Sequence, residues 1–377
     1  MKLMVPGPAE TYADDLVQMA RPLLPHYGAQ FLEVWHSVEA NLKKIMGTTG
    51  CLIMVPGAGT AGTEMALCGF GGRKCLVVRA GTFSDRLAEI LAAHGATVVD
   101  ITVPDRQCAS ADAVRSALRE HKDAVAVCMV HSETSTGVLH PVPEIARVVR
   151  ESSALFVVDA VSSMGSLEFR MDEWGVDICW TASQKALGCP PGLAMVALSR
   201  PAIDFLEGNS ANIRSWYLNP LVWKWHADNW EWHPYPTSLP TPVFVAMRGV
   251  LDRLIDTGLS AHYVRQSRAA EAIRRGSLAM GFALYPESET FASPTITALI
   301  PPAGLDEALF REVVLKEHAV MIAGGFGKLR GQIIRIGHMG PGIDADHTLT
   351  TLYGMECALR KQGMQCAPCA SLSAAFG

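Results

Sequence analysis

Apolar stretches alternate with amphipathic ones from about residue 50 to about residue 200. The apolar stretches predict strands at residues 51–55, 74–79, 97–101, 124–130, 155–159, 177–181 and 193–198. Apolar positions at helical spacing predict helices at residues 33–46, 63–70, 83–94, 110–120 and 143–150. Strands and helices that alternate in this way predict an α/β fold, with a mostly parallel seven-stranded sheet and helices on both of its faces.

The pattern changes after residue 200. Residues 215–242 hold five tryptophans and several prolines, and we expect an irregular segment there. We predict one long helix from about residue 243 to residue 280, followed by strands at 295–300 and 333–336 and a helix at 307–317. The Ala/Ser-rich last dozen residues are expected to fray. These features divide the chain into an N-terminal segment at 1–15, a large domain at 16–254 and a small C-terminal α+β domain at 255–377.

Composition and charge argue against several kinds of function. The chain has 377 residues, 49% of them hydrophobic, and a formal net charge of -5 with no basic tract, which argues against nucleic acid as a partner. The ten cysteines are scattered, as in a reduced cytoplasmic enzyme. Cys366 and Cys369 have metal or redox spacing but lack a second pair, so we predict no metal site. No apolar run reaches the ~20 residues of a membrane span, and no signal peptide is evident, so we expect a cytoplasmic protein without membrane contact.

Lys185 is the first candidate for chemistry. It follows the apolar stretch 176–180 and precedes the tight turn Pro190-Pro191-Gly192. A partly desolvated lysine at a strand end loses part of its preference for the charged form and becomes a nucleophilic amine, as a Schiff base with a carbonyl cofactor requires. Taken alone, the position equally suits a lysine whose ammonium group reaches solvent.

Asp159 ends the buried strand predicted at 155–159, which places its carboxylate at the carboxyl edge of the sheet. Ligands of open α/β sheets bind at that edge. A carboxylate there can keep the ring nitrogen of pyridoxal phosphate protonated, so that the ring accepts electrons. A helix cap or a turn aspartate is the alternative.

Two further features could bind anions. The turn Gly57-Ala58-Gly59-Thr60 precedes a predicted helix, whose first amides and positive end suit a phosphate. Arg335 follows an apolar strand and precedes the turn Gly337-His338-Met339-Gly340. Its planar guanidinium matches a substrate carboxylate in a way that lysine cannot. A common glycine turn and a surface arginine are the respective alternatives.

Taken in order, these motifs carry a resemblance over nearly the whole chain. They are Pro6-Gly7-Pro8, the segment 56–64, His131-Ser132-Glu133-Thr134-Ser135-Thr136-Gly137, Val158-Asp159-Ala160-Val161, Ser183-Gln184-Lys185-Ala186-Leu187 and Arg335-Ile336-Gly337-His338-Met339-Gly340. The chain resembles the class V aminotransferases, and within them the alanine–glyoxylate and serine–glyoxylate (serine–pyruvate) group. The resemblance implies the fold type I of pyridoxal-phosphate-dependent transferases.

The resemblance also implies roles for single residues. Lys185 and Asp159 are the implied catalytic pair, and Gly7 and Arg335 the implied substrate-binding residues. The implied contacts of pyridoxal 5'-phosphate are Gly59, Thr60, Phe83, Thr134, Asp159, Val161, Gln184, Lys185, Tyr235 and Ser238. Phe83 is expected to stack on the cofactor ring, with Val161 on the opposite face and Thr134 near the phenolic oxygen.

Tyr235 and Ser238 are expected to reach the phosphate of the neighbouring subunit in a homodimer with shared active sites. The family usually has threonine where we place Ser238, so Thr237 or Thr241 could serve instead. The tryptophans nearby are expected in subunit or domain packing rather than in a substrate cage. Relatives often carry serine and histidine where this chain has Ala58 and Thr60, which leaves fewer side-chain donors for a phosphate.

The implied reaction is a ping-pong transamination from a small amino acid, alanine or serine, to a short 2-oxo acid, glyoxylate or pyruvate. Lys185 would act as general base, and Asp159 would stabilise the protonated ring. A pyridoxamine–pyruvate or ureidoglycine–glyoxylate transaminase stays open, as does a lyase of the same fold. A desulfurase would need histidine where Gln184 stands, and a non-catalytic cofactor-binding regulator has no attached DNA-binding module here. The identity of the substrates is not encoded in any motif that we recognise.

Overall fold

The computed structural model describes residues 1–377. A seven-stranded sheet forms the large domain, in the order β2-β10-β9-β8-β5-β3-β4. Its strands are β2 (Cys51–Pro56), β3 (Lys74–Arg79), β4 (Thr97–Thr102), β5 (Ala124–Val130), β8 (Leu155–Asp159), β9 (Ile178–Ala182) and β10 (Leu193–Leu198). Only β10 runs antiparallel to its neighbours, β2 and β9. The predicted mostly parallel sheet is therefore confirmed, and β8, β9 and β10 are buried along their whole length, as continuous apolar strands require.

Helices cover the sheet. They are α2 (Ala29–Met46), α3 (Gly59–Leu67), α4 (Thr82–Ala93), α5 (Ala111–Glu120), α6 (Val142–Val149), α7 (Met171–Trp174), α8 (Arg200–Gly208), α9 (Pro220–Asn229) and α10 (Thr241–Thr257), after the short α1 (Ala13–Gln18). A small antiparallel pair, β6 (Ser132–Glu133) and β7 (Val138–Leu139), follows β5. None of the helices combines the length and the apolar character that crossing a bilayer requires.

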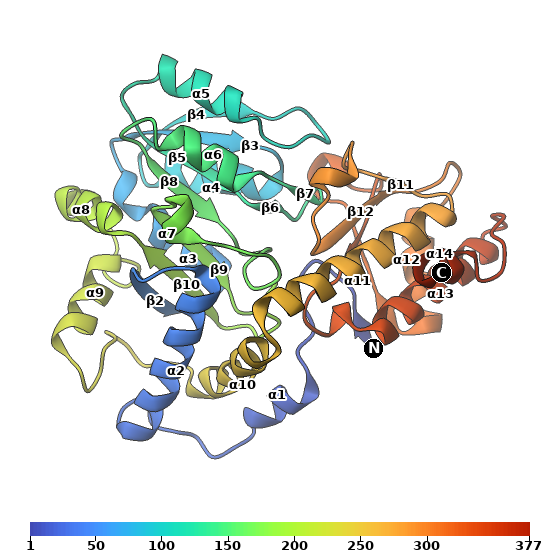
Figure 1. The fold of residues 1–377 in the computed structure, drawn as a ribbon, viewed down its shortest axis with the longest axis horizontal. Helices are drawn as coiled ribbons and strands as arrows, with labels where there is room; N and C mark the ends of the chain where they lie inside the picture. The colour runs from blue at the N-terminus through green and yellow to red at the C-terminus, as the bar shows by residue number, and fades with distance from the viewer.

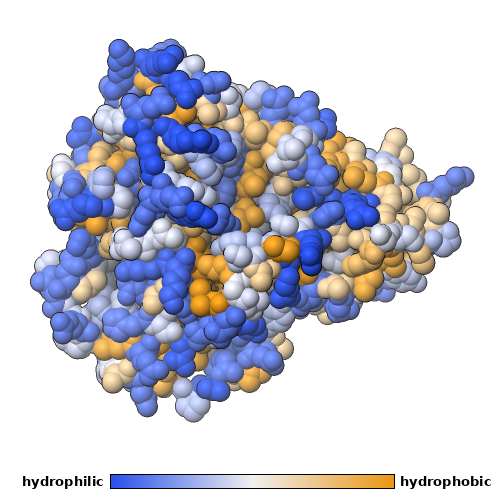
Figure 2. Space-filling view, in the orientation of Figure 1, coloured by the Kyte–Doolittle hydropathy of each residue, from blue (hydrophilic) through white to orange (hydrophobic).

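The small domain is α+β. Its four-stranded sheet has the order β11-β12-β15-β14, formed by β11 (Ala283–Leu284), β12 (Ile296–Ile300), β15 (Ile334–Gly337) and β14 (Ala323–Gly324). Its helices are α11 (Leu259–Ala279), α12 (Glu307–His318), α13 (Ala345–Lys361) and α14 (Ala370–Phe376). The N-terminal strand β1 (Lys2–Leu3) pairs with β13 (Val320–Met321), so both chain ends lie in the small-domain half of Figure 1. Figure 2 shows apolar side chains gathered where the two domains meet.

Three details differ from the sequence-based expectations. The long helix expected at 243–280 is two helices, because Gly258 adopts φ 84° between α10 and α11 and ends the first one. The segment 215–242 is not wholly irregular, because Asn219 caps α9 through the backbone N–H of Leu221. Arg335 lies within β15 rather than after it.

The C-terminal residues form a docked helix instead of fraying. The buried carboxylate of Glu356 accepts hydrogen bonds from the backbone N–H groups of Cys369 and Ser371, at 3.0 and 2.8 Å. Gly276 of α11 allows the close approach, because a Cβ there would lie 3.0 Å from the carbonyl oxygen of Ser371. Small side chains therefore allow α14 to pack, rather than leaving it without contacts.

Candidate active site

A cavity of about 640 Å³ opens at the carboxyl edge of the seven-stranded sheet. Its lining consists of Ala58, Gly59, Thr60, Thr63, Phe83, Arg86, Leu87, Val130, Ser132, Thr134, Asp159, Val161, Ser162, Gln184 and Lys185. All the residues predicted to contact a cofactor line this cavity, except Tyr235 and Ser238. Loops that follow β2, β3, β5, β8 and β9 supply them, as expected for parallel strands that end at one edge.

Lys185 lies in the loop after β9. Its Nζ donates a hydrogen bond to the carbonyl oxygen of Pro6 at 2.5 Å and lies 5.6 Å from the centre of the Phe83 ring. Burial lowers the pKa of this amine to about 8, against an opposing effect of the Asp159 carboxylate. The side chain is therefore much closer to a neutral nucleophile than a lysine in water.

Asp159 ends β8 and is 9% exposed. One carboxylate oxygen accepts a hydrogen bond from the backbone N–H of Val161 at 2.8 Å, and no group of the chain donates to the other. Burial raises the pKa of Asp159 to about 7, and the hydrogen bond from Val161 opposes that shift. A cationic partner in the cavity would therefore stabilise this carboxylate strongly.

The turn before α3 presents unpaired donors. The first helical residues, Gly59 and Thr60, have no intrahelical acceptor for their N–H groups, and Ala58 at the N-cap offers no side-chain acceptor. Gly57 has φ 152°, and a Cβ there would lie 2.7 Å from Ala61, so the turn needs glycine at this position. Free amides at a helix N-terminus, beside the Thr60 hydroxyl, form a site that suits a phosphate.

Phe83 and Val161 line the same cavity from different elements, the start of α4 and the loop after β8. Thr134, after β6, shares a hydrogen bond of 2.5 Å with the Ser162 hydroxyl. The arrangement therefore combines an aromatic ring, an aliphatic side chain and a pair of hydroxyl groups around one space. These groups fit a flat, polar-edged ring such as that of pyridoxal phosphate.

Arg335 approaches Thr134 from the small domain. Its Nη1 donates to the carbonyl oxygen of Thr134 at 3.0 Å, and its Nε donates to that of Gly324 at 2.8 Å. The guanidinium carbon lies 4.1 Å from the centre of the Phe326 ring, and the side chain is 2% exposed. Burial lowers the pKa of Arg335 to about 10, so the group stays charged at neutral pH.

Gly7 lies against Lys185. Its φ is 131°, and a Cβ on Gly7 would lie 2.5 Å from the Cδ and Cε atoms of the lysine. Any larger residue would therefore displace the amine. The N-terminal segment thus contacts the cavity residue Lys185, although neither Gly7 nor Arg335 lines the cavity itself.

Tyr235 and Ser238 do not line the cavity of their own chain. The Tyr235 side chain is buried, and its hydroxyl donates to the carbonyl oxygen of His26. Ser238 is exposed. Their contact with a neighbouring subunit stays a prediction, and the free hydroxyl of Ser238 suits it better than the engaged one of Tyr235.

The sequence analysis did not select Arg86 or Glu133. Arg86 lines the cavity one turn after Phe83 on α4, with its guanidinium carbon 5.1 Å from the centre of the Phe83 ring, and it has no acidic partner. The helical spacing of residues 83 and 86 was the available signal. Glu133 is fully buried within the quoted motif at residues 131–137, where its type alone suggested no role.

Comparison with solved structures and with related sequences shows which class of protein has this fold. Over 99% of this chain and 96% of the other, the fold superposes with a TM-score of 0.92 on the ureidoglycine–glyoxylate aminotransferase of Bacillus subtilis, at 26% sequence identity. The sequence is 33% identical, over 96% of this chain and 94% of the relative, to an uncharacterized aminotransferase of Methanocaldococcus jannaschii. It is 30% identical to the serine–glyoxylate aminotransferase of Methylorubrum extorquens, over 99% and 94% of the two chains.

Residues 9–276 match the family model described as aminotransferase class V. The chain belongs to this family, and it is an aminotransferase of the same α/β fold as the pyridoxal-phosphate enzymes of fold type I. The predicted resemblance is confirmed. Relatives act on several different substrates, so family membership does not decide which ones this chain uses.

Proposed function

We propose that this aminotransferase uses pyridoxal 5'-phosphate to move an amino group from a small amino acid, alanine or serine, to a short 2-oxo acid, glyoxylate or pyruvate. The observation that carries the proposal is the single cavity that holds a desolvated amine, a buried carboxylate and a free helix N-terminus, at Lys185, Asp159 and Gly59. When bound, the cofactor supplies an electron sink that stabilises the carbanion formed at the amino acid Cα.

The residues of the chain divide the remaining work. The amides of Gly59 and Thr60, with Gln184 nearby, would hold the phosphate. Asp159 would hold a proton on the ring nitrogen, since it lines the cavity and no group of the chain donates to one of its carboxylate oxygens. Phe83 and Val161 would orient the ring between them and exclude water.

Lys185 would bind the cofactor covalently and then move the proton. With an amino acid in the cavity, the Lys185 amine would take and hold the proton from the substrate Cα. A pKa of about 8 suits this exchange at neutral pH, because neither protonation state is strongly favoured. Arg335 would bind the substrate carboxylate, and the backbone at Gly7 would close the same side.

Two features support a cytoplasmic homodimer with shared active sites. Ser238 is exposed, as are four tryptophans that precede it in the sequence, at positions 216, 225, 230 and 232. Exposed aromatic surface of this kind is typical of subunit interfaces. All ten cysteines are unpaired, in keeping with a reducing compartment. The division into residues 1–15, 16–254 and 255–377 also stays a proposal, with the helix break at Gly258 close to the second boundary.

The test is an absorption spectrum of the purified protein with added pyridoxal phosphate, recorded while amino donors are titrated. We expect a visible cofactor band that one donor bleaches and that glyoxylate or pyruvate restores. A protein without that band has no lysine anchor at residue 185. A band that no donor bleaches favours a lyase or a non-catalytic binder.

The alternative is a pyridoxamine–pyruvate or ureidoglycine–glyoxylate transaminase, as two relatives are named, at 27% and 28% identity. A transaminase that takes free pyridoxamine needs no phosphate cup. Ala58 leaves the free amides of Gly59 and Thr60 accessible from the cavity, and this favours the phosphorylated cofactor. Including pyridoxamine and ureidoglycine among the donors decides between these reactions.

A further inference from the structure

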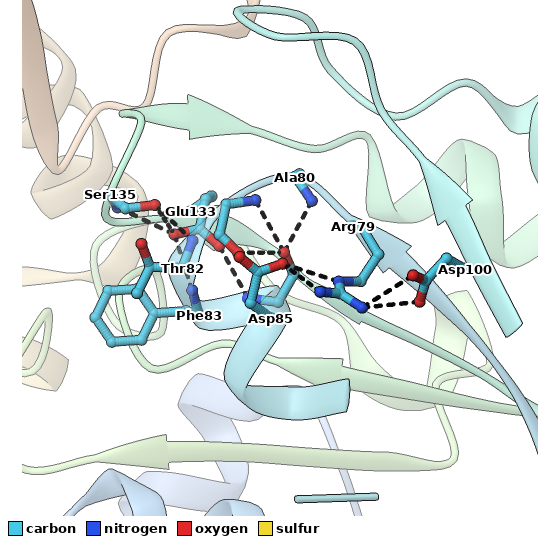
Figure 3. A network of polar contacts seen from close by, with 10 residues as sticks. Arg79, Ala80, Thr82, Phe83, Asp85, Asp100, Glu133 and Ser135 are labelled. Atoms are coloured by element: carbon cyan, nitrogen blue, oxygen red, sulfur yellow. Dashed lines mark hydrogen bonds and ion pairs between the residues drawn. The ribbon is translucent and has the colours of Figure 1, made fainter. Parts of the chain in front are cut away.

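Glu133 is a buried carboxylate for which the proposed reaction has no use. It accepts hydrogen bonds from the backbone N–H groups of Phe83, Ser84 and Ser135, at 3.4, 3.1 and 3.0 Å, and from the Ser135 hydroxyl at 2.5 Å. Figure 3 shows Phe83 and Ser135 next to Glu133, with dashed lines for the hydrogen bonds. Every polar contact of the carboxylate is a donor, and no cationic partner contacts it. Burial raises the pKa of Glu133, and these hydrogen bonds oppose that shift.

These contacts cap a helix from a distance. Helix α4 begins at Thr82, and its N-cap residue is Gly81, which has no side chain to accept the first amides. Glu133 accepts from Phe83 and Ser84, and the Ser135 hydroxyl accepts from the Thr82 N–H at 3.0 Å. A carboxylate at this end of a helix also interacts favourably with the helix dipole.

Gly81 is necessary for this arrangement. A Cβ on Gly81 would lie 2.5 Å from the Ser135 Oγ and 2.7 Å from the Glu133 Cγ. A local cap such as serine or aspartate therefore cannot fit where the distant carboxylate sits. The start of α4 depends on a segment that lies about fifty residues further along the chain.

The capped helix and the capping segment both reach the cavity. Phe83 and Arg86 line it from α4, while Ser132 and Thr134 line it from the two sides of Glu133. The carbonyl oxygen of Thr134 also accepts from Arg335. Burial lowers the pKa of both Lys185 and Arg335, and the negative charge of Glu133 opposes both shifts, so this carboxylate lies within electrostatic reach of the site.

We propose that Glu133 is a positioning residue. It caps α4 in place of the helix's N-cap residue, Gly81, and thereby fixes the Phe83 ring against the cofactor. The inference rests on the proposed function for its second half, the contact with the cofactor. Its first half, the cap, concerns the chain alone. The two halves can therefore be measured separately.

The variant is Glu133→Gln, which keeps the size of the side chain but turns an NH₂ group toward N–H donors. In the cofactor-free protein we expect amide hydrogen exchange at Phe83 and Ser84 to be about tenfold faster. With pyridoxal phosphate we expect the dissociation constant to rise about tenfold and the induced circular dichroism of the bound cofactor to weaken. Glu89→Gln is the matched control, because Glu89 is an exposed residue of α4 with no polar partner.

The outcomes are distinguishable. If amide hydrogen exchange at Phe83 and Ser84 is unchanged in Glu133→Gln, Glu133 does not cap α4. Faster exchange with an unchanged dissociation constant and unchanged dichroism overturns the positioning role. A wild-type chain that binds no pyridoxal phosphate overturns the proposed function, while the exchange data still decide the cap. If Glu133→Gln does not fold, Ser135→Ala repeats the test, because it removes one donor to Glu133 and the acceptor for Thr82, and the same three results are expected at smaller size.

Discussion

The two sides of the proposed active site, which consists of the cavity and the residues next to it, are built in different ways. On one side, Gly59 and Thr60 present backbone amides at the start of a single helix, next to the strand that precedes it. On the other side, Gly7, Thr134 and Arg335 come from the N-terminal segment, the large domain and the small domain. The first side depends on a local turn, whereas the second exists only when three distant segments are correctly placed.

This difference assigns separate tasks to the two sides. Backbone amides at a helix terminus keep their geometry when side chains change, which suits them to bind the phosphate of the proposed cofactor. The second side depends on domain contacts, such as the 2.8 Å hydrogen bond between the Ser132 and Ser293 hydroxyls and the bond from Thr295 to the Ser162 carbonyl oxygen at 2.7 Å. Changes there should alter substrate recognition while cofactor binding is kept.

The largest expected effect comes from the residue between the two sides. Lys185→Ala would remove the proposed covalent anchor and the proposed general base together, so we expect transamination to fall by about 10⁴-fold. Binding of pyridoxal phosphate should persist without a covalent link, because the helix terminus is untouched. Mass spectrometry after borohydride reduction measures the link, with Lys122→Ala as an exposed-lysine control. A covalent adduct retained in Lys185→Ala contradicts the assignment.

A smaller effect is expected on the substrate side alone. Arg335→Lys keeps the charge but loses the planar fork that donates to Gly324 and Thr134 and that, in the proposed function, would bind a carboxylate. We expect KM for the amino donor to rise by about 10- to 100-fold, with the dissociation constant of the cofactor nearly unchanged. Steady-state kinetics and a cofactor titration measure the two quantities. Arg330→Lys, at an exposed position, should change neither quantity. If Arg335→Lys weakens cofactor binding as much as substrate binding, the two sides do not act separately.

The same contrast explains what could be predicted from the sequence. Asp159, Lys185 and the turn at Gly59 follow apolar strands directly, so strand order and the carboxyl edge of the sheet bring them together. The role of Glu133 could not be predicted, because its partners at Phe83 and Ser84 are fifty residues away and no local pattern links them. The docked C-terminal helix escaped prediction for a similar reason, because it depends on the distant carboxylate of Glu356. The break at Gly258 has a local cause instead, since the glycine itself takes a positive φ and ends α10.

A third prediction sharpens the comparison through pH. Burial disfavours the protonated form of Lys185 and brings its pKa to about 8, against 10.5 for an ordinary lysine. In the cofactor-free protein, the rate at which an amine-directed reagent modifies Lys185 should therefore rise about tenfold from pH 7 to pH 9 and then level off. Because the Asp159 carboxylate raises this pKa, Asp159→Asn should move the profile to lower pH. Peptide mapping gives the rate, and a rate that still climbs steeply beyond pH 9 argues against a desolvated amine.

The smallest effect is expected at the edge of the substrate side. The Phe326 ring is about half exposed and lies over the Arg335 guanidinium at 4.1 Å, so it supports the cation without hydrogen bonding to it. Phe326→Leu removes the interaction of the cation with the ring, and we expect KM for the amino donor to rise by about two- to fivefold with kcat unchanged. Phe376→Leu, at an exposed phenylalanine of α14, is the control. A fall in kcat with unchanged KM would mean that Phe326 acts after substrate binding. In that case the loop that carries this ring would have a role of its own, separate from both the cofactor side and the substrate side of the site.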